Sequence, residues 1–187
     1  RAFDIAVISG NVSFYNDTQG ASIPPTPTVA LVGLIADAHR TATVAMPAEG
    51  AELLLLGSGQ PELEGSEYLV QRHACTGDRP PSIDLAGERR LGEFCSDLIA
   101  DGTVRTAHDV ADGGLAVALT EMCFASNVGC RVEVETAGRS DVALFGESGC
   151  RIVIAVAAGE GAGIEARAAA ADVACRRLGT SGGDAVR

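Results

Sequence analysis

The sequence predicts a layered α/β/α domain built around a mixed sheet. Short apolar runs, typical of buried strands, alternate along the chain with longer segments that have a helical apolar stripe. Apolar residues make up 47% of the 187 residues, which excludes wholesale disorder. A chain of this length buries roughly 70% of its unfolded surface, enough for one sizeable core.

Three strands are expected in the first third of the chain. Residues 3–9 and 28–35 are apolar at most positions, and residues 51–56 form a third run closed by glycines. Between the first two runs, residues 23–27 contain three prolines, which favour an extended path. We therefore expect a domain boundary there, with residues 1–22 as the tail of one domain and residues 23–187 as another.

The later elements alternate between helix and strand. Residues 84–101 carry apolar side chains at helical spacing, and Gly102 is a suitable residue to end that helix. Residues 60–82 are predicted to be mostly loop, with a turn of helix at 66–70. The remaining predictions are a strand at 104–110, a helix at 115–126, strands at 130–135 and 151–157, and a helix at 165–178.

Charge and composition exclude several classes of partner. Acidic residues outnumber basic ones by 25 to 14, so binding to nucleic acid or to an anionic membrane surface is not expected. Every basic residue is Arg, so no lysine can act as a phosphate clamp. No apolar run reaches the roughly 18 residues that span a bilayer. Six cysteines without a C-x-x-C pair indicate reduced thiols in a cytoplasmic protein.

A first polar stretch at residues 9–18 follows the first predicted strand. Gly10 would let the backbone approach a ligand closely. Asn11, Ser13 and Asp17 add oxygen atoms that suit Mg²⁺ and phosphate. The alternative interpretation is an ordinary turn rich in Asn and Asp.

A second stretch, residues 107–115, joins a predicted strand to a predicted helix. The strand would deliver His108 and Asp109 to the sheet edge, while Asp112 would cap the helix that Gly113 and Gly114 open. Two carboxylates beside a helix N-terminus favour Mg²⁺ and a bound anion. The alternative is that Asp112 is a cap and Asp109 a turn residue, with no ligand.

A third stretch, residues 144–151, places Glu147 and Ser148 between two apolar segments. By spacing alone, the simpler interpretation is a hairpin turn with a polar tip.

Together these stretches resemble the synthetase subunit of the phosphoribosylformylglycinamidine synthase family, also called formylglycinamide ribonucleotide amidotransferase. The resemblance rests on the order of the motifs at 9–18, 25–27, 65–69, 108–115 and 144–148, and it spans about residues 5–184. This family lies in the aminoimidazole ribonucleotide synthetase superfamily. The resemblance implies that residues 1–22 end an N-terminal-type domain and that residues 23–187 form a C-terminal-type domain.

The resemblance also implies an activity. Such a ligase uses ATP and Mg²⁺ to convert formylglycinamide ribonucleotide and glutamine-derived ammonia to the amidine, in purine biosynthesis in the cytoplasm. The implied partners are a glutaminase subunit, a small accessory subunit and the first half of the same subunit. Because the family's catalytic histidine lies in that half, we expect no catalytic residue here and no activity from the isolated chain.

Site roles follow from matching positions in the family's motifs. Gly10 corresponds to an ATP contact, Asn11 to a Mg²⁺ ligand, and Ser13 to a substrate contact. Asp109 corresponds to a residue that binds both metal and nucleotide in the large, fused forms of the family. The same motif contains further positions to which no single role is assigned: His108, Asp112, Gly113 and Gly114.

Two other interpretations stay open from the sequence. One is a different ATP-dependent synthetase or kinase of the superfamily, such as a thiamine-phosphate kinase, although the Asn-Val-Ser-Phe-Tyr-Asn run in the first polar stretch argues against it. The other is a nonenzymatic scaffold domain that contributes an interface while the chemistry happens elsewhere.

Overall fold

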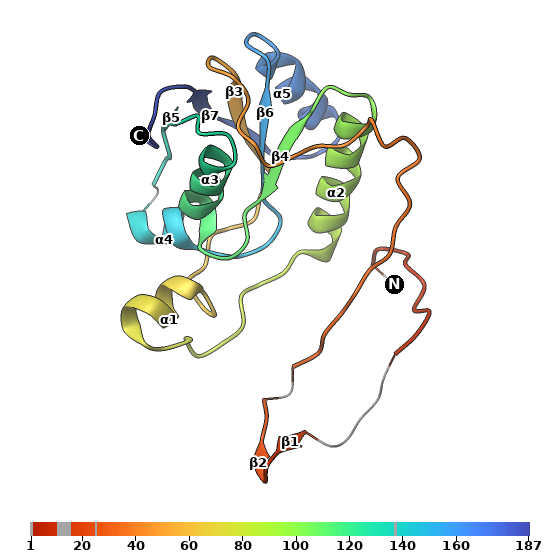
Figure 1. The fold of residues 1–187 in the computed structure, drawn as a ribbon, viewed down its shortest axis with the longest axis vertical. Helices are drawn as coiled ribbons and strands as arrows, with labels where there is room; N and C mark the ends of the chain where they lie inside the picture. The colour runs from red at the N-terminus through yellow and green to blue at the C-terminus, as the bar shows by residue number, and fades with distance from the viewer. Residues whose placement is uncertain (1, 11–15, 25, 137) are drawn as a thin grey trace.

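The protein consists of a sheet covered by helices on both faces and a long N-terminal segment outside it (Figure 1). The computed structural model describes residues 2–10, 16–24, 26–136 and 138–187. In this part of the chain, no helix combines the length and apolarity needed to cross a bilayer.

The sheet has five strands in the order β4-β6-β3-β7-β5. All four ladders between neighbouring strands are antiparallel, and parallel pairing in the described residues is confined to two isolated bridges. The predicted layered α/β class is confirmed, but the mixed pairing predicted for its sheet is wrong, because every ladder between its strands is antiparallel. The strands are β3 (Glu52–Leu56), β4 (Thr106–Asp109), β5 (Cys130–Val132), β6 (Ile152–Val156) and β7 (Cys175–Ser181).

Helices cover the two faces of this sheet. On one face α3 packs beside α4, and on the other lie α2 and α5 (Figure 1). The predicted helices at 84–101 and 115–126 are confirmed as α2 and α3, and the predicted turn at 66–70 belongs to α1. The helices are α1 (Glu67–His73), α2 (Leu85–Ala100), α3 (Gly114–Phe124), α4 (Ser140–Phe145) and α5 (Gly161–Ala170).

The four leucines of β3 explain why both faces need cover. Successive side chains of a strand point to opposite faces, so Leu53 and Leu55 enter one core while Leu54 and Leu56 enter the other. A central strand that is buried on both faces has a continuous apolar run instead of an alternating one. Short segments of this kind are recognisable in the sequence, and the predicted strands at 51–56 and 151–157 are confirmed.

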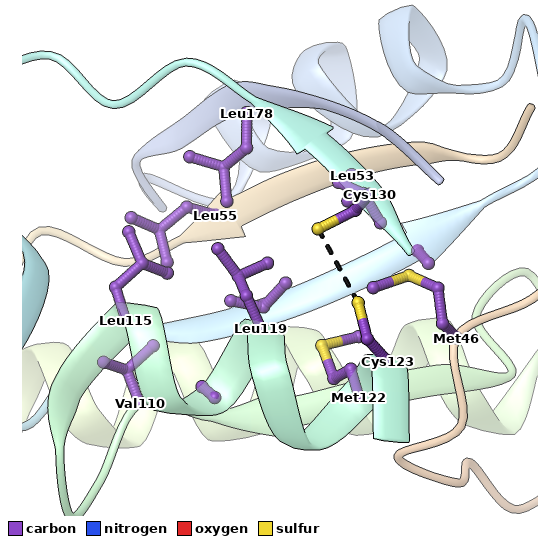
Figure 2. Close-up of a cluster of buried hydrophobic side chains, with 13 residues drawn as sticks. Met46, Leu53, Leu55, Val110, Leu115, Leu119, Met122, Cys123, Cys130 and Leu178 are labelled. Carbon is purple, nitrogen blue, oxygen red and sulfur yellow. Dashed lines mark hydrogen bonds between the residues drawn. The ribbon is translucent and has the colours of Figure 1, made fainter. Parts of the chain in front are cut away.

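Two cysteines meet in the core beneath α3. Figure 2 shows the Cys123 thiol of α3 pointing toward the Cys130 thiol of β5, with 3.8 Å between the sulfur atoms. Burial, reinforced by Cys123, raises the pKa of the Cys130 thiol to about 12. All six cysteines of the chain are free, and Cys123 and Cys130 pack here as small apolar groups.

The predicted strands at 3–9 and 28–35 are wrong for the residues described. Neither segment forms a strand, and Val32 and Leu34 are 91% and 100% exposed. Apolar, β-branched composition gives a strand only where a neighbouring strand satisfies the backbone. The N-terminal segment instead contains a two-strand hairpin, β1 (Asp17–Thr18) with β2 (Ala21–Ser22). The boundary predicted near residue 23 stays a prediction.

The predicted helix at 165–178 is wrong in its second half. The helix α5 ends at Ala170, and Asp172 adopts a left-handed backbone with φ of 54°. Residues from Cys175 onward form β7, which lies between β3 and β5. The alanine-rich run has high helix propensity, but pairing with two strands outweighs propensity at its end.

Candidate functional site

The loop from β4 into α3 carries the motif with two carboxylates. Asp109 is the last residue of β4, an edge strand, and its side chain is 75% exposed. Asp112 is also exposed, two residues before the helix begins. Both carboxylates therefore face solvent, as a site that receives a ligand from outside requires.

Two glycines turn the chain from this loop into α3. Gly113 and Gly114 have φ values of 80° and 72°, a left-handed backbone that residues with a side chain rarely adopt. A Cβ on Gly114 would also stand 2.7 Å from the backbone of Phe145 in α4. The glycine pair is therefore required by the turn and by the close approach of α4.

His108 is held on both sides of its ring. Its Nδ1 lies 2.7 Å from the backbone oxygen of Asp109, and its Nε2 lies 3.1 Å from a carboxylate oxygen of Glu121 on α3. These contacts tie the end of β4 to α3. Glu121 was not predicted, because no sequence spacing relates it to a residue 13 positions earlier.

A hollow of about 200 Å³ lies between the loop and α3. Among the residues that the structure describes, no group of three or more His, Cys, Asp or Glu side chains is arranged to hold a metal ion. Mg²⁺ bound with a nucleotide usually takes one or two carboxylates from the protein and its remaining ligands from phosphate and water. The pair Asp109 and Asp112 suits that arrangement. The hollow is lined by His108, Asp109, Ala111, Asp112, Ala118 and Glu121.

Asp112 does not cap α3, so that prediction is wrong. The cap residue is Gly113, whose N–H donates to Oε1 of Glu147 at 2.7 Å. The same oxygen accepts the N–H of Glu67, also at 2.7 Å, at the start of α1. One carboxylate thus accepts backbone N–H groups at the N-termini of two helices, where a negative charge is favoured.

The third stretch is not a hairpin turn. Glu147 and Ser148 follow α4, and the Ser148 hydroxyl is buried and donates to the backbone oxygen of Gln60. The sequence shows the polar pair, but its partners lie 34 to 88 positions away and only the fold brings them near.

The structure brings together the second and third stretches, and of the first it describes residues 9–10 and 16–18. Gly10 is exposed, and apart from its neighbours in the chain no other described residue has an atom within 4 Å of the place where a Cβ would stand. Asn11 and Ser13 lie outside the described residues, so their predicted roles stay predictions.

The family follows from a comparison with known domains. Residues 48–186 match the model of the AIR synthase related protein, C-terminal domain. The chain belongs to this family. The matched residues include the whole five-stranded sheet and all five helices of the described fold.

Relatives of this AIR synthase related chain extend the similarity beyond the domain. This chain is 45% identical over 184 residues, 96% of its own length, to the phosphoribosylformylglycinamidine synthase subunit PurL of Thermomicrobium roseum. The family resemblance predicted from the motifs is confirmed. The chain spans about a quarter of the length of the curated relatives that it matches.

Solved structures share the fold. T. maritima PurL complexed with FGAR superposes with a TM-score of 0.63 at 19% identity, over 75% of this chain and 25% of that one. T. maritima PurL complexed with ATP gives a TM-score of 0.61 at 17% identity, over 78% of this chain and 24% of that one.

Proposed function

We propose that this chain forms part of the synthetase subunit of a phosphoribosylformylglycinamidine synthase. In that role it takes part in the ATP-dependent conversion of formylglycinamide ribonucleotide and glutamine-derived ammonia to the amidine. The observation that carries the proposal is the 45% identity to a PurL subunit along nearly the whole chain. The named complexes of T. maritima PurL with FGAR and with ATP support the choice of substrate and nucleotide.

The loop between β4 and α3 is the proposed nucleotide-binding site of this chain. Asp109, with Asp112 beside it, would hold Mg²⁺ through carboxylate oxygens, and the metal would neutralise charge on the nucleotide phosphates. An acidic chain without lysine can bind a nucleotide in this way because the cation comes with the ligand. Gly10, Asn11 and Ser13 keep their proposed contacts with ATP, Mg²⁺ and substrate respectively.

The same proposal covers partners and location. A glutaminase subunit and a small accessory subunit would complete the enzyme, and a named PurLQS structure from Thermotoga maritima supports an assembly of this kind. The first half of the subunit would supply the catalytic residues. The complex would act in the cytoplasm, and the 187-residue chain alone would form no amidine.

Calorimetric titration with Mg²⁺-ATP and Mg²⁺-ADP tests the nucleotide site. We expect saturable binding by the chain, and Asp109→Ala should weaken it at least about tenfold, because a charge-assisted metal ligand is lost. Asp97→Ala, which removes an exposed carboxylate from α2, is the matched control and should bind as the parent does. Equal affinity of the two variants would reject the site.

A second experiment separates an enzymatic role from a scaffold role. Asp109→Ala is introduced into the full-length subunit, and amidine formation and subunit assembly are both measured. Loss of turnover with intact assembly supports the proposal. Unchanged turnover with weakened assembly would instead identify this domain as a nonenzymatic scaffold.

A further inference from the structure

A larger cavity, of about 540 Å³, opens at the C-terminal end of β3. The glycine-rich loop after β3, the start of β7 and one side of α4 contribute to its wall, with Leu55 and Leu115 among the apolar residues. This volume is in the range that holds a small metabolite. Among the described residues, none lines both this cavity and the hollow at Asp109.

A buried arginine in this wall lacks a partner for part of its guanidinium. Arg151 is 5% exposed, and its Nη2 donates to the backbone oxygens of Gly146 and Ser148 at 2.6 and 3.3 Å. Its Nε is buried and has no hydrogen-bond partner among the described residues. A buried cation is costly unless it is paired, and the backbone oxygens that bond Nη2 are neutral, so the charge of this guanidinium lacks a counter-ion among the described residues.

A second arginine faces the same space. Arg176, on β7, is exposed and lines the cavity. Burial lowers the pKa of the Arg151 guanidinium, and the charge of Arg176 lowers it further, as expected for two cations on one wall. Within the described chain, no carboxylate forms an ion pair with either of them.

The charge of the cavity differs from that of the molecule. The chain has a net charge of −11, yet the charged residues that line this cavity are three arginines and one glutamate. The third arginine, Arg139, is already bonded to Asp141. Arg151 and Arg176 are therefore the two cations available to a ligand.

We propose that this cavity binds the phosphate group of a small phosphomonoester through Arg151 and Arg176. A phosphomonoester carries close to two negative charges at neutral pH, which match two guanidiniums. The planar guanidinium donates to phosphate oxygens in a fork, and the apolar wall leaves room for the organic part of the ligand. The inference goes beyond the proposed function, because it concerns a separate cavity and requires no turnover.

The test is a calorimetric titration of the 187-residue chain with ribose 5-phosphate as the probe, in a buffer free of phosphate. We expect saturable binding that weakens at least about tenfold in Arg176→Gln, since one charge-assisted contact is lost. Arg176 is exposed and without an ion pair, so this variant should fold. Arg177→Gln removes the next guanidinium of β7, which is bonded to Glu52 at 3.0 Å and does not line the cavity, and should bind normally.

Titrations with other anions test which chemical class of ligand the cavity binds. Inorganic phosphate and succinate should each bind more weakly than ribose 5-phosphate, and equal binding of either would overturn the assignment to a phosphomonoester. Absence of saturable binding, or equal effects of Arg176→Gln and Arg177→Gln, would overturn the site. Asp109→Ala should leave ribose 5-phosphate binding intact, so failure here and failure of the nucleotide site are separate results.

Discussion

The central strand β3 and the segment at residues 28–35 are both apolar in sequence, but β3 is buried and the segment is exposed. Both are runs of aliphatic residues, but Leu54 is fully buried whereas Leu34 is fully exposed. The difference lies in the neighbours: β3 pairs with β6 and β7 and is covered by helices on both faces, while residues 28–35 form no strand. Apolar composition marks a segment that can be buried, and only a partner decides whether it is.

The largest expected effect is a direct contrast between these two runs. Leu54→Ala should lower the free energy of unfolding by about 2–5 kcal/mol, because it removes a packed side chain and leaves a cavity. Leu34→Ala should change it by no more than about 0.5 kcal/mol, as for other surface substitutions. Urea denaturation measures both variants. A large loss of stability in Leu34→Ala would show that residues 28–35 are packed in solution.

The next effect concerns Glu147, whose carboxylate joins two helices within the packed region. Glu147→Ala should lower the free energy of unfolding by about 1–3 kcal/mol, since two N–H groups lose one charged acceptor. Glu147→Gln keeps an oxygen acceptor and should cost less. Circular dichroism during urea denaturation measures the free energy of unfolding of the parent and of both variants. Equal stability of all three proteins would contradict this role.

A smaller effect is the response of the core to alkaline pH. The pKa of the Cys130 thiol is raised by burial from 9.0 to about 12, so the folded state holds this proton more tightly than the unfolded state. The resulting stability is fully present below pH 9 and is lost as pH rises toward 12. By pH 10 the loss should be on the order of 1 kcal/mol. Burial raises the pKa of Cys175 to about 11, which acts in the same direction.

Urea denaturation at pH 8 and pH 10 measures this dependence. In Cys130→Ala the difference in unfolding free energy between the two pH values should shrink, whatever the cost of the substitution at pH 8. A slope identical to that of the parent would mean that the Cys130 thiol titrates normally. The exposed Cys75→Ala is the control and should keep the parental slope.

Elements with a self-contained signal were predictable. The stripe of α2 and its cap at Asp84, which accepts the N–H groups of Ala86 and Gly87, lie within one stretch of sequence. The end of α5 was not predictable from the sequence, because β7, which follows it, pairs with strands more than 40 residues away. In the site, the Asp109 loop was found from its motif, whereas the role of Glu147 and the contact of Glu121 with His108 were not.

The sequence by itself determined the α/β class and the loop with two carboxylates, because periodicity and motifs are local properties of the chain. It also indicated the family, through the order of the motifs along the chain. Only the tertiary structure decided which apolar runs became strands, that Glu147 accepts the N–H of Gly113 at the start of α3, and that Arg151 was buried beside Arg176. Each of these depends on groups distant in the chain, which compete for the same backbone and the same buried space. That competition has no signature in any single stretch of residues.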